Sequence, residues 1–140
     1  MRLILDTNVY SDYAEGKPEA VDIIARKAQE ICFPAIVLGE LYYGFGKSSR
    51  KKLNEQNIEQ FINLFHVEII AAGENVSRKY ALIYEYLEKK GYKIPINDVW
   101  IAACCMADGG TLLTRDNHFN DVEQIEKIVL DRAIYTVINP

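Results

Sequence analysis

Four acidic residues lie in sequence contexts from which their carboxylates could bind a divalent cation. Asp6 and Asp116 each follow a short apolar segment. Asp98 opens a long apolar stretch, and Glu40 lies within a helical pattern. Two carboxylates about 4 Å apart repel by roughly 4 kcal/mol at an effective dielectric near 20, so a cluster of four needs protons or a cation. Because all-oxygen ligands favour magnesium, manganese or calcium, the acids predict a site for one of these ions.

Each acid also has an ordinary structural interpretation. Asp6 can form a turn or cap a helix, and Asp98 suits the positive end of a helix dipole. Asp121 is a nearby substitute for Asp116. Glu40 is more informative, because no Lys or Arg lies three or four residues away on its helix. A half-buried carboxylate without a partner is costly, so a cation is one way to satisfy it, and a basic residue distant in the sequence is the alternative.

Other ligand types are scarce in the sequence. Asn8, Asn97 and Asn117 lie within one or two residues of a candidate acid and could orient ligands or water, although single asparagines more often form turns. The two histidines, His66 and His118, form no HxxxH pair, and the cysteines form no CxxC pair. This argues against a zinc site.

Short apolar segments alternate with helical patterns along the chain. The alternation predicts an α/β fold with a mostly parallel sheet, in which sites form beyond the carboxyl ends of the strands. Residues 6–8 are expected to form a turn and Asn97 to cap a helix. The expected strands cover residues 3–5, 31–33, 67–70, 111–114, 128–130 and 135–138. The expected helices begin at Pro18 and near residue 36, and cover 75–90 and 97–107; another helix is marked by Ile58, Ile62 and Phe65.

Size and charge limit the possible functions. The 140 residues, 49% hydrophobic and 26% charged, fit one domain over 1–140. A net charge of −4 disfavours nucleic-acid binding by bulk attraction, so a basic patch or a bound cation must supply the attraction. The sequence contains one candidate basic patch, which consists of Lys47, Arg50, Lys51 and Lys52. A solvated surface is an equally good interpretation of these four residues.

The chain carries no sign of export or membrane insertion. The apolar run before Asp6 is three residues long, too short for a secretory signal, and the longest run, 99–107, is too short to span a bilayer. Three cysteines, Cys32, Cys104 and Cys105, make no even disulfide set. They indicate buried thiols in a reducing compartment, and we expect a cytoplasmic protein.

Four short motifs contain the acids and their polar neighbours. In chain order they are Leu5-Asp6-Thr7-Asn8-Val9, Gly39-Glu40-Leu41, Asn97-Asp98-Val99-Trp100-Ile101-Ala102-Ala103 and Leu113-Thr114-Arg115-Asp116. None is specific alone. Taken together, in this order and spacing, the sequence resembles the PIN-domain nucleases over nearly its whole length, and within them the VapC-type toxins of bacterial toxin–antitoxin pairs.

The resemblance implies a three-layer α/β/α fold with a parallel sheet, and a nuclease that uses Mg²⁺ or Mn²⁺ to cleave RNA. It also implies a cognate antitoxin protein as partner and a homodimer. The last acid is the least uniform in such proteins. Carried onto this chain, the acidic set would be Asp6, Glu40, Asp98 and Asp116, supported by the polar residues Thr7, Asn8, Asn97 and Thr114.

Two alternatives stay open and two fail. An inactive binding or regulatory module on the same fold would keep the acids as caps, and a nuclease could act on DNA instead of RNA. A haloacid-dehalogenase phosphatase needs a second Asp where this chain has Asn8. A P-loop at Gly46-Lys47-Ser48 lacks the required glycine, because position 41 is Leu.

Overall fold

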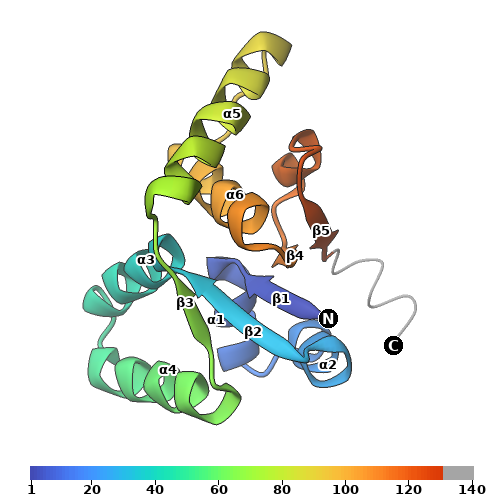
Figure 1. Cartoon of the computed structure of the whole chain (residues 1–140). Helices are drawn as coiled ribbons and strands as arrows, with labels where there is room; N and C mark the ends of the chain where they lie inside the picture. The colour runs from blue at the N-terminus through green and yellow to red at the C-terminus, as the bar shows by residue number, and fades with distance from the viewer. Residues whose placement is uncertain (131–140) are drawn as a thin grey trace.

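A five-stranded parallel sheet organises the chain in the computed structural model, which describes residues 1–130 (Figure 1). The elements are β1 (Arg2–Leu5), α1 (Thr7–Ala14), α2 (Pro18–Lys27), β2 (Glu30–Pro34), α3 (Ala35–Gly46), α4 (Lys51–Phe65), β3 (Glu68–Ile70), α5 (Glu74–Lys90), α6 (Ile96–Asp108), β4 (Thr111–Thr114), the 3-10 helix η1 (Asn117–Asp121) and β5 (Glu126–Val129). The predicted α/β class is confirmed. The strand expected at 135–138 lies outside the described residues.

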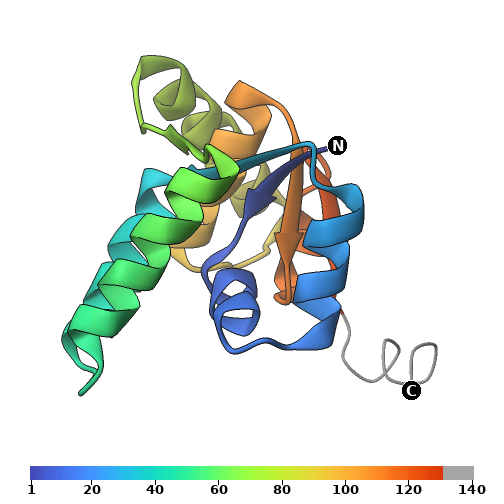
Figure 2. The same ribbon diagram turned by 90° about the horizontal axis from the view of Figure 1, so that it is seen from below.

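Helices cover both faces of the sheet, which gives the three-layer α/β/α arrangement. Figures 1 and 2 show α5 and α6 on one side of the strands and α1 and α2 on the other. The inner strands read as continuous apolar runs because both of their faces are covered: residues 3–5 of β1 are fully buried. Residues 101–105 of α6 are also buried, because α6 packs against α5 as well as against β4. No helix within residues 1–130 is long and apolar enough to cross a membrane.

The strand order places one crevice at the centre of the sheet. The order is β3-β2-β1-β4-β5, and all neighbouring strands are parallel. From the central pair β1 and β4, the strand order runs outward to β2 and β3 on one side and to β5 on the other. This reversal is a topological switch point, and ligands bind at such points beyond the carboxyl ends of the strands. The backbone N–H of Asp6 donates to Leu113 O at 3.0 Å, which sets the ends of β1 and β4 side by side.

Two local predictions are wrong. Residues 6–8 do not form a turn, because Thr7 begins helix α1 and Asp6 is its N-cap. The helix has only eight residues, too few for a clear apolar periodicity, yet Val9 and Tyr10 bury its inner face. Asn97 does not cap α6 either. The helix begins at Ile96 with Pro95 in the N-cap position, where the fixed φ of proline suits the entry to a helix, and no side chain caps it.

Candidate active site at the carboxyl ends of β1 and β4

The four acids face one cleft beyond the carboxyl ends of the central strands. Asp6 follows β1, Asp116 follows β4, Asp98 lies in the first turn of α6 and Glu40 lies on α3. The cleft measures about 530 Å³, which leaves room for ions, water and a phosphate group. The structure therefore brings together the acids that the sequence singled out, while their chemical roles stay predictions. The lining residues are Asp6, Thr7, Asn8, Glu40, Pro95, Ile96, Asn97, Asp98, Asp116 and His118.

Asp6 is the most rigidly held of the acids and is only 3% exposed. Its Oδ1 accepts from the backbone N–H of Thr7 at 2.8 Å, so the carboxylate does cap α1. Its Oδ2 accepts from the hydroxyl of Thr114 at 2.6 Å. Thr114 is fully buried, and its Oγ1 also accepts from the backbone N–H of Asp116 at 3.0 Å. One buried threonine thus orients the acids of both strands.

Polar side chains on α1 hold the other two sides of the cleft. Asn8 donates from Nδ2 to Asp116 Oδ2 at 3.2 Å and accepts at Oδ1 from the backbone N–H of Arg115 at 3.2 Å. The hydroxyl of Thr7 donates to Glu40 Oε1 at 2.7 Å. No Lys or Arg within the described part of the chain forms an ion pair with Glu40. A neutral hydroxyl partner leaves the negative charge of Glu40 available to a cation.

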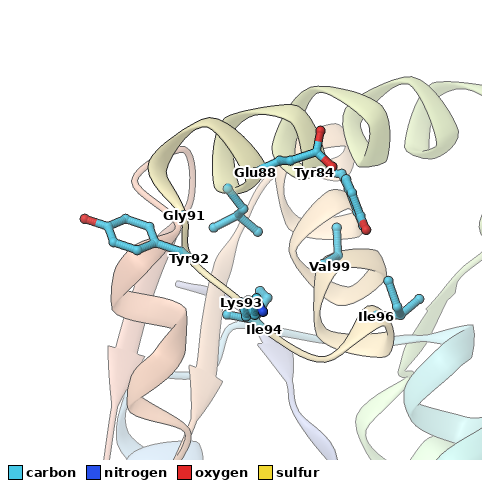
Figure 3. A pocket seen from close by; sticks show the side chains of 9 residues that line it. Tyr84, Glu88, Gly91, Tyr92, Lys93, Ile94, Ile96 and Val99 are labelled. Carbon is cyan, nitrogen blue, oxygen red and sulfur yellow. The ribbon is translucent and has the colours of Figure 1, made fainter.

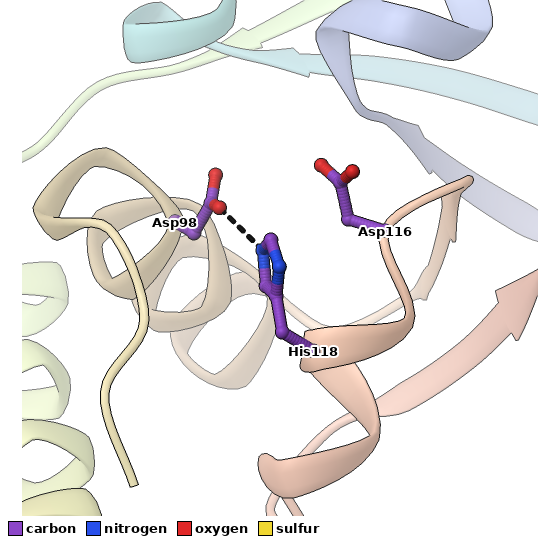
Figure 4. Close-up of side chains that lie close together, drawn as sticks. All are labelled: Asp98, Asp116 and His118. Atoms are coloured by element: carbon purple, nitrogen blue, oxygen red, sulfur yellow. Dashed lines mark hydrogen bonds and ion pairs between the residues drawn. The ribbon is translucent and has the colours of Figure 1, made fainter.

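His118 is a cleft residue that the sequence interpretation missed. Its Nε2 lies 2.6 Å from Asp98 Oδ2 in a hydrogen bond, and its ring is half-buried (Figure 4). The residue stands on η1, two positions after Asp116. Its position just beyond a strand-end acid is a local signal for a site residue, whereas the spacing of the two histidines argues only against zinc.

Among the described residues, the acids do not all form one tight ligand set. Ligand atoms of Asp98, Asp116 and His118 lie within 4.8 Å of one another. Asp6 and Glu40 line the same cleft outside this group, each with a carboxylate oxygen bound to a threonine hydroxyl. Asn97 is exposed at the cleft wall, and Asp121 closes η1 outside it, so Asp116 is the strand-end acid that faces the others.

Comparisons with known proteins agree with this geometry. The model of the PIN domain matches residues 3–125, a span that holds all four acids. The chain belongs to the PIN-domain family. It is 30% identical to Ribonuclease VapC2 of Rickettsia felis over 94% of this chain and 97% of that protein. It is also 30% identical to Ribonuclease VapC4 of Mycobacterium tuberculosis, over 68% of this chain and 73% of that one.

A solved structure matches the fold closely. The crystal structure of VapBC2 from Rickettsia felis bound to a DNA fragment from their promoter aligns with a TM-score of 0.80 and 28% identity. The alignment covers 94% of this chain and 100% of that one. The predicted family and its three-layer fold are confirmed.

Burial and the charges of neighbouring acids raise the pKa of two of the PIN-domain acids, Asp6 and Asp98. Burial, followed by the charges of Asp98 and Asp116, raises the pKa of Asp6 to about 6, although the hydrogen bonds from Thr114 and Thr7 oppose the change. Burial likewise raises the pKa of Asp98 despite the contact with His118. Asp6 resists ionisation, and its hydrogen-bond partners within the described residues are the backbone N–H of Thr7 and the hydroxyl of Thr114, so a divalent cation would supply the positive charge that they do not.

The raised pKa of Asp6 predicts an unusual pH dependence for the PIN domain without metal. The folded chain holds this proton up to about pH 6, whereas an unfolded carboxyl loses it near 3.8. The unfolded state therefore binds fewer protons in this window, and the free energy of unfolding falls as the pH rises through it. The expected loss from Asp6 is about 3 kcal/mol, complete by pH 7. Chemical denaturation in the presence of a chelator measures it.

The Asp6→Asn variant provides the control for this pH effect. It lacks the titrating group, so its unfolding free energy should fall less between pH 4 and 7. Added Mn²⁺ should restore stability to the wild-type protein at pH 7. Equal pH slopes in the two proteins would show that Asp6 does not carry the effect.

A buried charge cluster anchors the loop that carries Asp116. The guanidinium of Arg115 contacts the carboxylates of Asp12 on α1 and Glu19 on α2, and both acids are less than 9% exposed. Lys17 adds a second cation at 3.2 Å from Asp12. Because Arg115 and Asp116 are adjacent, the cluster fixes the end of β4 relative to both helices.

Two further surface features lie outside the acid cluster. The residues of the basic patch are exposed where α3 passes into α4, with Lys51 Nζ 3.3 Å from Glu55. A second pocket of about 380 Å³ lies between α5, α6 and the segment that joins them (Figure 3). Tyrosine and aliphatic side chains dominate its wall, with Glu88 as its one carboxylate. It therefore offers no second cluster of ligating groups.

Proposed function

We propose that this PIN-domain protein is a divalent-cation-dependent endoribonuclease and the toxin of a toxin–antitoxin pair. The observation that carries the proposal is the shared cleft: carboxylates from four separate elements meet at the switch point of the sheet. The relatives that match most of this chain bear the name ribonuclease, and the matched complex contains a VapB partner with its VapC. An inactive binding module gives no reason to gather four acids that repel one another, two of them buried.

Asp98, Asp116, Asp6 and Glu40 would hold Mg²⁺ or Mn²⁺. When bound, such an ion lowers the pKa of a bound water and stabilises charge that develops on the phosphate. The buried hydroxyl of Thr114 keeps an oxygen of Asp6 oriented, and Asn8 does the same for Asp116. Supports of this kind fix the angles at which ligands meet a cation, which is why we assign the threonines and asparagine a positioning role.

Cleavage of RNA by the purified protein tests the proposal. We expect cleavage of cellular RNA with Mn²⁺ or Mg²⁺ and none with a chelator, and no cleavage by Asp98→Asn. Single-stranded DNA serves as a parallel substrate. Cleavage of DNA alone would replace the proposed substrate, and no cleavage of either polymer under any metal would leave the inactive module as the function.

The basic patch is proposed to contact the RNA backbone. Neutralising its four residues to Gln should reduce the slope of log affinity against log salt by as much as about 3, because each phosphate contact on a single strand contributes about 0.7. Filter binding of RNA to an Asp6→Asn background measures the slope without cleavage. The patch variant changes Lys47, Arg50, Lys51 and Lys52.

A second fourfold variant controls for total charge. It neutralises four cations that are exposed elsewhere on the surface and should leave the slope close to that of the parent. If both variants change the slope equally, the patch is ordinary solvated surface. The control variant changes Arg26, Lys27, Arg78 and Lys89.

The proposed partners follow from the same family assignment. We propose a cognate antitoxin protein that inhibits the nuclease, and a homodimer of the chain itself. We also propose the cytoplasm as its location, because Cys32, Cys104 and Cys105 are all free and buried. Co-expression with the protein encoded beside it, followed by copurification and size measurement, tests both assemblies.

A further inference from the structure

His118 points into the acid cleft as if it belonged to the ligand set. Figure 4 shows its ring between the carboxylates of Asp98 and Asp116, with Nε2 2.6 Å from Asp98 Oδ2. Ligand atoms of the three side chains lie within 4.8 Å of one another. Asp98 lies on α6, Asp116 lies between β4 and η1, and His118 lies on η1. The fold therefore places the imidazole beside Asp98, 20 residues away in the sequence.

We propose that His118 is a nitrogen ligand of the cation in this cleft, and that it makes the site selective for Mn²⁺ and similar transition ions over Mg²⁺. The inference rests on the proposed metal-dependent function. It goes further by naming a ligand other than the four acids and by assigning a metal preference to the site.

The distances suit a six-coordinate ion. With ligand bonds of about 2.1 Å, neighbouring ligands of an octahedral ion stand about 3.0 Å apart and opposite ligands about 4.2 Å apart. The separation of 2.6 Å between Asp98 and His118 is a few tenths of an ångström below the first value. All separations in the group are at most 4.8 Å, a limit close to the second value. Small rotations of the side chains would bring all three onto one ion.

The surroundings hold the imidazole in place. Phe119, the next residue, is fully buried, and its ring centroid lies 5.1 Å from that of His118. Asp116 is fixed by Asn8, and Asp98 by the first turn of α6. Little reorganisation is therefore needed to assemble a mixed ligand set of oxygen and nitrogen.

Ligand chemistry then decides which ions the site prefers. Mg²⁺ takes oxygen ligands in a strict octahedron and keeps several waters, whereas imidazole binds transition ions well. A pure counter-ion role for His118 would act differently, because an imidazolium paired with Asp98 opposes every cation alike. The two roles are separated by whether removal of the ring affects Mn²⁺ and Mg²⁺ unequally.

Pulsed EPR of bound Mn²⁺ tests the assignment directly. We expect modulation from a directly bound ¹⁴N in the wild-type protein and its loss in His118→Asn, whose shorter side chain cannot reach the Nε2 position. His66→Asn is the matched control: His66 is exposed, lies outside the cleft and has a φ of 50° that Asn also accepts. This control should keep the nitrogen signal.

Metal affinities provide the second readout. His118→Asn should weaken Mn²⁺ binding by about 10-fold or more and Mg²⁺ binding by less than about 3-fold. Absence of nitrogen coupling at saturating Mn²⁺, or an equal change for both ions, overturns the assignment. If the coupling is absent while RNA cleavage still requires Asp6, His118 is not a ligand and the nuclease stands. If wild-type protein binds neither ion and cleaves no RNA, both proposals fail.

Discussion

Asp6→Asn is expected to lower the rate of RNA cleavage by about 10³-fold or more while the fold is kept. The amide has nearly the shape of the carboxylate, and its oxygen can still accept from the backbone N–H of Thr7. What disappears is one negative charge in a buried cleft, and cation-assisted stabilisation of the transition state is worth several kcal/mol. At about 1.4 kcal/mol for each factor of ten, a loss of about 4 kcal/mol gives this reduction. Single-turnover cleavage of a labelled RNA measures it.

Asp121→Asn is the matched control for this experiment. It makes the same chemical change a few residues beyond Asp116, on η1 but outside the cleft. Its cleavage rate should stay within a few-fold of wild type. If Asp6→Asn retains full activity, or if both variants lose it equally, the acid cleft is not where cleavage occurs.

Removing the guanidinium of Arg115 is expected to destabilise the protein by about 3–5 kcal/mol. Arg115→Met keeps a long apolar side chain but takes away a cation that contacts two buried carboxylates, Asp12 and Glu19. Breaking a buried ion pair from one side costs this much, because the remaining charges stay desolvated. Lys17, 3.2 Å from Asp12, offsets only part of this loss. Since marginal domains have only 5–15 kcal/mol in total, urea denaturation should show a large shift of the midpoint.

Arg78→Met provides the comparison on the surface. Arg78 pairs with Glu74 at 2.8 Å on α5, but both side chains are largely exposed. An ion pair in water contributes little, so this variant should unfold close to the wild-type midpoint. Equal midpoints for the two variants would mean that the Arg115 cluster does not hold the end of β4 in place.

The parts of the fold that bury apolar surface in a regular way could be predicted from sequence. The strand at 111–114 was predicted with its observed bounds, and the helix at 75–90 begins only one residue earlier than expected. Each has a sequence pattern that fits only one kind of element. The strand is a short apolar run between turn residues, and the helix is an amphipathic repeat ended by glycine. The position of Asp6 and Asp116 at neighbouring strand ends followed from the parallel sheet alone.

The parts that depend on tertiary contacts could not be predicted. Helix α1 is too short for its periodicity to stand out, and it is held by a cap and by packing. His118 meets Asp98 across 20 residues of sequence, and Arg115 meets Glu19 across 96. The local sequence around either residue does not indicate which side chain it contacts, because contacts between elements depend on how the whole domain packs.

Diffraction at the manganese absorption edge, on crystals grown with Mn²⁺, tests most directly whether the gathered acids share an ion. We expect an anomalous peak in the cleft within bonding distance of Asp98 and Asp116, with Asp6 and Glu40 facing the same ion directly or through water. The same crystals of the Asp6→Asn variant should show a weaker peak. A cleft with no peak at saturating Mn²⁺, or a peak only at acids elsewhere on the surface, would contradict the account.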